Sequence, residues 1–109
     1  MALDYRVAFA DQDWRPAFEG TARTKRVARG GKAFRLLELT PSSHHPHWCE
    51  AGHAGLVVEG ELELEFETGP VRFAAGDALM IPDGAADRHR PRALTPRTVL
   101  FLIEEGEAS

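Results

Sequence analysis

Apolar and charged residues alternate strictly over residues 61–67, in the order Glu-Leu-Glu-Leu-Glu-Phe-Glu. Side chains with this period point to opposite faces of a β-strand, so the segment is predicted to bury one face and expose the other. The four glutamates are interpreted as a solvated sheet face rather than as a cation-binding comb, because antiparallel sheets commonly keep one polar face in water.

Turn-forming residues divide the middle of the chain into short pieces. Glycine- and proline-containing turns stand at Gly60 and at residues 68–70, 76–77 and 82–84. Besides residues 61–67, strands are predicted at residues 34–40, 56–59, 71–74, 78–81, 88–94 and 97–103. Helix signals are weak, and residues 11–18 are expected to hold one short helical turn at most. Many short strands with regular turns predict an all-β sandwich or barrel.

Length and composition narrow the class of protein. A chain of 109 residues has room for one core, so a single domain is expected over residues 1–109, with residues 104–109 as an acidic, flexible tail. An apolar share of 43% and a net charge of −4 argue against disorder and against nonspecific nucleic-acid binding. The N-terminal residues are not interpreted as a secretory signal, no apolar run has membrane-spanning length, and the sequence has one cysteine. We therefore expect a cytoplasmic protein without membrane or nucleic-acid partners.

Basic residues are concentrated between Arg23 and Arg35. They are interpreted as the exposed surface of an edge strand, where lysine and arginine discourage pairing with other sheets. An anionic ligand is the alternative interpretation of the same segment.

Four of the five histidines lie within residues 44–53, in the string HHPHWCEAGH, and the fifth is His89. Imidazole is the commonest metal ligand, so such a cluster indicates a metal site. In an extended strand, His45, His47 and Cys49 would share one face. A turn at residues 50–52 could bring His53 back towards them.

The spacing of these residues resembles the two motifs of the cupin superfamily. Residues 47–60 contain His-x-Cys, three residues, His, six residues and Gly, and residues 55–62 are similar to the hairpin of that motif. Residues 76–84, with Gly, five residues and Pro-x-Gly, match the second motif. The resemblance covers residues 42–90. It implies a small cupin, an all-β jelly-roll barrel (double-stranded β-helix) of two antiparallel sheets.

The ligand positions depart from the family pattern. Cys49 stands at the second histidine of the first motif, His53 at the usual Glu or Gln, and Asp87 at the histidine of the second motif. The resemblance implies a metal site of His47, Cys49 and His53 with either Asp87 or His89, which would share a strand face. An alternative register takes residues 45–47 as the His-x-His pair and makes His45 a substitute ligand.

Imidazole and thiolate ligands suit zinc, iron, nickel or copper better than magnesium or calcium. The first hypothesis is a metal-dependent enzyme, similar to the dioxygenases and isomerases of the family, acting on a small organic substrate. The second is a noncatalytic module that binds or senses a small molecule, with or without metal. Cysteine and histidine are themselves good ligands, which favours retained metal binding. Since small cupins often pair through an N-terminal strand, the resemblance also implies a homodimer, with residues 3–9 as that strand.

Overall fold

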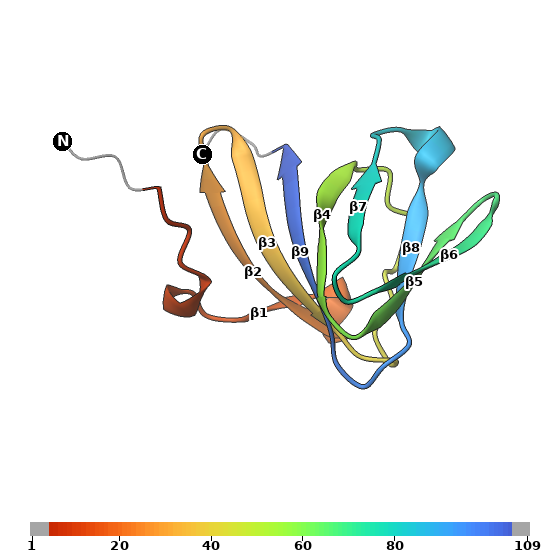
Figure 1. The fold of residues 1–109 in the computed structure, drawn as a ribbon, viewed down its shortest axis with the longest axis horizontal. Coiled ribbons are helices and arrows are strands. Elements are labelled where there is room, and N and C mark those ends of the chain that lie inside the picture. Colours follow the sequence, from red (N-terminus) through yellow and green to blue (C-terminus); the bar gives the residue numbers. More distant parts are fainter. Residues whose placement is uncertain (1–4, 106–109) are drawn as a thin grey trace.

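The structure is a computed structural model that describes residues 5–105 (Figure 1). Its strands are β1 (Arg15–Ala17), β2 (Ala22–Arg29), β3 (Lys32–Leu39), β4 (His53–Glu59), β5 (Glu61–Phe66), β6 (Gly69–Ala74), β7 (Ala78–Ile81), β8 (His89–Ala93) and β9 (Thr98–Glu105). Three short 3₁₀ turns accompany them: η1 (Phe9–Asp11), η2 (Phe18–Gly20) and η3 (Ala85–Asp87). Within residues 5–105, no helix is long and apolar enough to cross a membrane.

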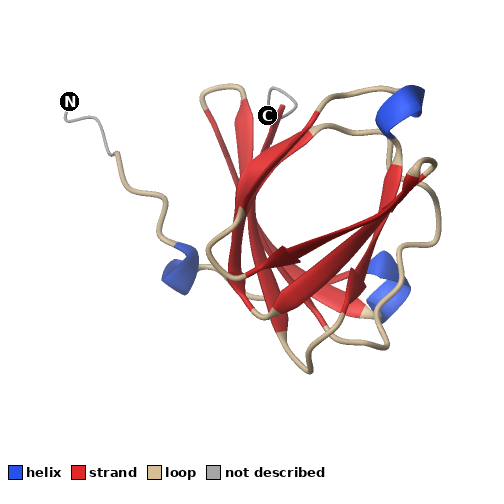
Figure 2. Ribbon diagram, turned by 45° about the vertical axis from the view of Figure 1, so that its right-hand side comes forward, coloured by secondary structure: helices blue, strands red, loops and turns tan. Residues whose placement is uncertain are grey.

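The strands form two antiparallel sheets that face each other and enclose a barrel (Figure 2). The larger sheet has the order β1-β2-β3-β9-β4-β7, and the smaller has the order β6-β5-β8. The predicted all-β jelly-roll barrel of two antiparallel sheets is therefore confirmed. Its core lies between the sheets, where the inward residues of both meet.

Strand β5 follows the predicted alternation. Leu62 and Leu64 are buried in the core, whereas Glu61 and Glu65 are exposed. The glutamates of its outer face pair with arginines around them: Glu63 with Arg72 and Arg92, Glu65 with Arg90, and Glu67 with Arg88. The outer face of the smaller sheet is thus a charged surface, as the sequence predicted.

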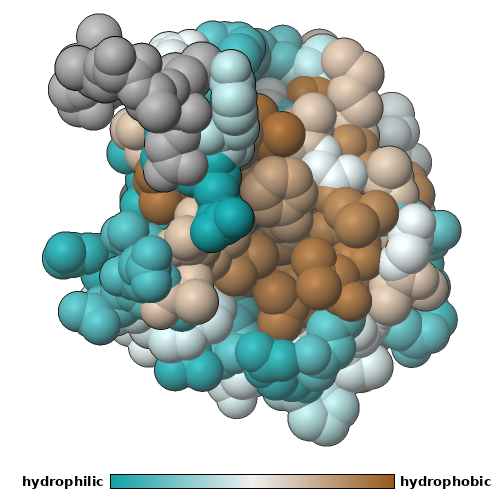
Figure 3. All heavy atoms as spheres, turned by 60° about the vertical axis from the view of Figure 1, so that its left-hand side comes forward, coloured by the Kyte–Doolittle hydropathy of each residue, from teal (hydrophilic) through white to brown (hydrophobic). Residues whose placement is uncertain are grey.

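The outer face of the larger sheet is apolar instead. Two rows of outward side chains cross four neighbouring strands: Phe34, Ile103, Ala54 and Met80 in one row, and Leu36, Phe101, Leu56 and Ala78 in the other. Met80 is 79% exposed and Leu56 is 39% exposed. Figure 3 shows a broad apolar area on the side of the molecule that lies left in Figure 1. We call these two rows the apolar sheet face.

Two glycines allow β4 to hold its place in the barrel. A Cβ atom at Gly55 would lie 1.9 Å from the carbonyl oxygen of Phe101, so only glycine lets β4 approach β9 this closely. Gly60 turns the chain from β4 into β5 with a φ of +81°, a conformation that other residues rarely adopt. Both glycines therefore help to fix the strand that begins at His53.

Several local predictions were wrong. Strand β9 continues through Glu104 and Glu105, which were expected in the flexible tail, because both residues extend the ladder with β3; residues 106–109 lie outside the described residues. Residues 5–8 form no strand and η1 follows them, while residues 3–4 lie outside the described residues. Residues 11–18, which were expected to hold one short helical turn at most, contain β1 together with the last residue of η1 and the first of η2.

Candidate metal centre

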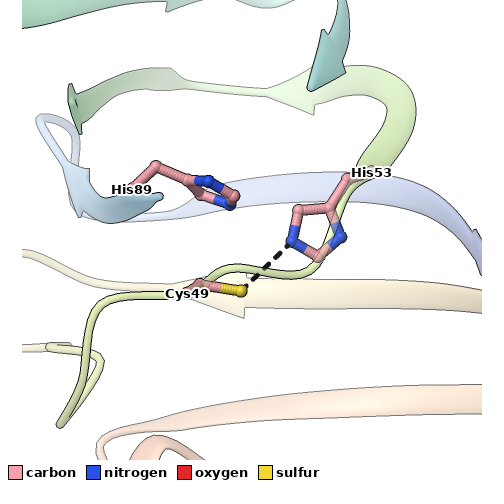
Figure 4. Close-up of side chains that lie close together, drawn as sticks. All are labelled: Cys49, His53 and His89. Carbon is pink, nitrogen blue, oxygen red and sulfur yellow. Dashed lines mark hydrogen bonds between the residues drawn. The ribbon is translucent and has the colours of Figure 1, made fainter. Parts of the chain in front are cut away.

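Three side chains with metal-binding atoms meet at one end of the barrel. Cys49 precedes β4, His53 begins β4 and His89 begins β8, and their ligand atoms all lie within 4.8 Å of one another. Figure 4 shows the sulfur atom and the two rings pointing toward a common space. The Cys49 Sγ atom lies 3.6 Å from the Nε2 atom of His53, and the two imidazole rings are 5.1 Å apart.

The backbone brings these residues together from distant parts of the chain. Cys49 and His89 exchange two hydrogen bonds, with Cys49 N–H donating to the His89 carbonyl at 2.8 Å and His89 N–H donating to the Cys49 carbonyl at 3.0 Å. Gly84 N–H donates to the Glu50 carbonyl at 2.9 Å and fixes the loop between Cys49 and His53. The turn predicted at residues 50–52 thus returns His53 to the side of Cys49.

His89 is buried, with 3% of its surface exposed, and its ring is oriented by the backbone. Its Nδ1 atom lies 3.0 Å from the Asp87 carbonyl oxygen. A carbonyl oxygen only accepts, so Nδ1 carries a proton, and in the neutral ring Nε2 presents a lone pair. This buried Nε2 atom has no hydrogen-bond partner within residues 5–105. Buried polar atoms are almost always satisfied, so an atom of this kind calls for a water molecule or a ligand as its partner.

His53 is oriented by a carboxylate. Its Nδ1 atom lies 2.5 Å from an oxygen of Glu104, and Arg35 pairs with the same carboxylate at 3.2 Å. The Arg35–Glu104–His53 series leaves the Nε2 atom of His53 facing Cys49. Metal-binding histidines usually donate their second nitrogen to a carboxylate or carbonyl oxygen, which sets the tautomer. In this cluster Nδ1 of His53 faces the Glu104 carboxylate, and Nδ1 of His89 faces the Asp87 carbonyl oxygen.

The cluster also favours the thiolate form of cysteine. The hydrogen bond with His53 is the largest cause that lowers the pKa of Cys49 to about 5. Burial alone would lower the pKa of His53, but the hydrogen bonds to Cys49 and Glu104 outweigh it and raise that pKa to about 9. Burial would raise the pKa of Glu104, and contact with His53 and Arg35 lowers it overall. A thiolate is the form of cysteine that binds metal.

A pocket of about 50 Å³ opens from the cluster into the barrel. We call its core side the apolar wall, formed by Leu37, Leu64, Leu79, Ile81, Leu100 and Leu102. The half-buried residues Phe18, His45 and Pro91 complete the lining together with Arg35 and the three cluster residues. The metal-binding atoms therefore stand at the edge of a mainly apolar cavity.

The other predicted site residues lie outside the cluster. The chain bends at Pro46 and His47 instead of continuing as a strand, so the shared face expected for His45, His47 and Cys49 does not form, and His47 is exposed. His45 lines the pocket with its ring 4.7 Å from that of Phe18. Asp87 lies in η3 rather than on the strand of His89, and it contributes its carbonyl oxygen rather than its carboxylate.

Two residues of the site were not predicted from the sequence. Glu104 had been placed in the tail and Arg35 on an exposed edge strand, yet β3 is flanked by β2 and β9 and Arg35 lines the pocket. A signal for Glu104 was present: it continues the inward alternation of Leu100 and Leu102. An acid at an inward position of a strand requires a partner, and here the partners are His53 and Arg35.

The fold and this cluster define a class: a jelly-roll barrel with a group of potential metal ligands inside one end. The chain belongs to the cupin family, since the family model described as Cupin domain matches residues 35–104. Among solved structures, KdgF from Halomonas sp. is 26% identical, with a TM-score of 0.71 and 90% of each chain covered.

Two further solved structures share the fold at lower identity. The oxalate decarboxylase of Lactobacillus farciminis is 19% identical with a TM-score of 0.76, and the match covers 100% of this chain and 35% of that one. A sugar phosphate isomerase from Silicibacter pomeroyi is 16% identical with a TM-score of 0.76, covering 94% of this chain and 76% of that one. A search of curated proteins gave no match.

Proposed function

We propose that this cupin domain binds a divalent transition metal through Cys49, His53 and His89, and that the metal holds a small organic molecule in the barrel. The observation that carries the proposal is the buried Nε2 atom of His89, which has no hydrogen-bond partner within residues 5–105. It lies within 4.8 Å of the potential ligand atoms of Cys49 and His53.

The donor set fits the metals that the sequence suggested. Two imidazoles and a thiolate suit zinc, iron, nickel or copper. Three protein ligands are typical of catalytic rather than structural zinc sites, because further positions remain for water or substrate. The contacts of His53 with Glu104 and of His89 with the Asp87 carbonyl are the outer partners that such ligands require.

An enzyme acting on a small organic substrate is the first candidate. A bound metal would supply Lewis-acid chemistry or, if iron, oxygen chemistry. The chain itself contributes orientation of the two imidazoles, exclusion of water by the apolar wall, and His45 as a group that can move a proton. Oxalate decarboxylase and sugar phosphate isomerase among the structural neighbours support small-molecule chemistry on this fold.

A noncatalytic binding or sensing module is the second candidate. It is favoured by the scarcity of ionisable groups in the pocket. Among the lining residues, His45 is the one ionisable side chain outside the cluster and the Arg35–Glu104 pair. The two candidates differ in turnover and share the metal site.

Elemental analysis of untagged protein tests the metal site. We expect stoichiometric metal in the wild type and in the exposed-histidine control His47→Ala, and loss of metal in the double variant Cys49→Ala/His53→Ala. Cobalt substitution adds a spectroscopic test, since a thiolate-to-cobalt absorption band should require Cys49. Absence of metal in the wild type after reconstitution would refute the proposal.

We propose further that a second copy of this chain covers the apolar sheet face. Its two rows span four strands, and a twofold axis would place the same face of each copy against the other. The chain itself covers only part of the face, where Phe9 packs against Phe101 with ring centres 6.1 Å apart. Contiguous exposed apolar patches usually mark an interaction surface.

Sedimentation equilibrium tests the homodimer. The wild type and the hairpin control Thr68→Lys, which changes an exposed residue away from this face, should be dimeric. The double variant Leu56→Lys/Met80→Lys should be monomeric while keeping the wild-type circular dichroism spectrum. A monomeric wild type at high protein concentration, or a dimeric double variant, would refute the interface.

A further inference from the structure

The pocket beside the cluster restricts which ligand the proposed metal site can take. We propose that it selects a small molecule with one metal-binding donor group on an uncharged, apolar body, and that Phe18 limits the size of that body. This inference rests on the proposed function, because the donor group is meant to meet the metal.

The lining provides apolar contact to most of a bound ligand. Eight of its 13 residues are apolar, and the six of the apolar wall belong to the buried core. These side chains come from strands of both sheets, so their positions are set by the packing of the barrel. A hydrocarbon group placed there would leave water for an apolar surface, which is favourable by itself.

The lining also offers no unpaired lysine or arginine. Arg35 is the one lysine or arginine among the lining residues. Its Nη1 atom lies 3.2 and 3.3 Å from the two oxygens of Glu104, and its Nε atom points to Thr24 Oγ1 at 3.5 Å. Recruiting Arg35 for an anionic ligand would remove an arginine partner from the half-buried Glu104, which would then rely on its contact with His53. A second carboxylate or a phosphate on the ligand is therefore disfavoured.

Phe18 enters the lining from a strained turn. Phe18 and Glu19 have φ angles of 51° and 54°, a left-handed conformation that is costly for residues other than glycine. The turn is held because Thr21 donates to the Phe18 carbonyl from N–H at 3.1 Å and from Oγ1 at 2.7 Å. The Phe18 ring is fixed beside His45 in this way. With about 50 Å³ of cavity, the ring limits the ligand to a short body.

Hydroxamates test the ligand class on zinc-loaded protein, because they carry one constant donor group on a variable body. In calorimetric titrations, affinity should rise roughly fourfold for each methylene from acetohydroxamate to butanohydroxamate. Succinic acid monohydroxamate, which has the same chain length and a terminal carboxylate, should bind at least about tenfold more weakly than butanohydroxamate, since the carboxylate must lose its hydration without a counter-charge. Equal or tighter binding of the carboxylate probe would overturn the proposal.

A second measurement on metal-free protein separates this inference from the metal site. Isobutanol should shift the ¹³C-methyl NMR signals of Leu37, Leu79 and Leu102, whereas glycerol at the same concentration should not. If the protein binds no zinc but isobutanol still shifts these signals, the metal site fails and the ligand class stands. If zinc binds and neither the methyl signals nor the hydroxamate series shows an apolar preference, the ligand class fails alone.

Phe18→Ala tests the size limit, with Phe9→Ala on the outer face as the matched control. In the wild type and in Phe9→Ala, hexanohydroxamate should bind no more tightly than butanohydroxamate. In Phe18→Ala, the gain of roughly fourfold per methylene should continue to the longer chain. An unchanged chain-length limit in a folded Phe18→Ala variant would show that Phe18 does not set the size.

Discussion

The barrel interior has two walls with opposite physical roles. The apolar wall consists of leucine and isoleucine side chains from strands of both sheets, and it forms part of the hydrophobic core. The cluster side consists of Cys49, His53 and His89 at a loop and at two strand beginnings. The first gains free energy by burial, whereas the second holds polar groups that cost free energy unless they are paired.

The comparison of the two walls distinguishes the residues that serve stability from those that serve ligand binding. The apolar wall would be needed in any barrel of this shape, so its residues explain stability. Neither the fold nor the core requires a buried histidine whose Nε2 atom has no hydrogen-bond partner among residues 5–105. Under the proposed function, the cluster side is explained by the ligand it would hold, and variants on the two walls should differ in kind.

The largest expected effect on stability comes from the apolar wall. Leu100→Ala removes a side chain that is 3% exposed in the core, so it should lower the free energy of unfolding by about 2–5 kcal/mol. The remaining folded protein should still bind metal stoichiometrically. Urea denaturation measures the loss, and Leu56→Ala on the outer face is the control, with a smaller expected change. Loss of metal without loss of stability would contradict the division of roles.

The cluster side should show the reverse behaviour. His89→Phe replaces a buried, unpartnered imidazole by an apolar ring next to Phe66, whose ring lies 5.8 Å from that of His89. Stability of the metal-free protein should change by less than about 1 kcal/mol, because the orphan nitrogen is removed along with one hydrogen bond. Metal affinity should fall more than about 100-fold, because loss of a ligand exceeds the effect of losing a residue that only hydrogen-bonds to a ligand. A metal competition assay measures it, and retained affinity would exclude His89 as a ligand.

Glu104 should have an intermediate effect. Glu104→Gln weakens the contact that orients His53, so metal affinity should fall by about 10- to 100-fold. Glu105→Gln is a matched control, because Glu105 is exposed and pairs with Lys32 at 2.6 Å, away from the cluster. Equal metal affinities of the two variants would show that Glu104 does not position the ligand.

The pH dependence of metal-free protein reports the pairing of the cluster side. Cys49 has its pKa lowered from 9.0 to about 5, so its stabilisation is lost as the pH falls toward 5. His53 has its pKa raised from 6.5 to about 9, so its stabilisation is present below 6.5 and is lost as the pH rises through 9.

Between pH 6.5 and 9, the contribution of Cys49 to the free energy of unfolding rises with pH, whereas the contribution of His53 falls, so the two cancel. The free energy of unfolding should therefore rise from about pH 5 to 6.5 and then stay level. Denaturation across this range tests the profile, and Cys49→Ser should flatten the rise. A wild-type profile that falls between pH 5 and 6.5 would contradict the thiolate–imidazolium pair.

The smallest expected effect is at His47. Because this side chain is exposed in the bend at residues 46–47, His47→Ala should leave metal affinity and stability within about 0.5 kcal/mol of the wild type. A large loss of metal affinity in this variant would instead support the ligand set that the family spacing implied.

Local pattern predicted much of the architecture because strand alternation is a local property. Residues 61–67 alternate with a period of two, and β5 buries Leu62 and Leu64 accordingly. Cys49, His53 and His89 were candidates because of their chemistry. The same logic failed at residues 45–49, where the chain bends at Pro46, since alternation holds only while the backbone is extended.

The sequence by itself determined the all-β class, the inward face of residues 61–67 and the set of candidate ligands. Only the tertiary structure decided that Glu104 and Arg35 support His53, and that the Asp87 carbonyl orients His89. It also placed His47 at the surface and Cys49 beside His89. These contacts join residues that are far apart in the chain. They depend on the pairing of β3 with β9, the pairing of β9 with β4, and the bridge between Cys49 and His89. The physical reason is that no local pattern encodes which strands become neighbours.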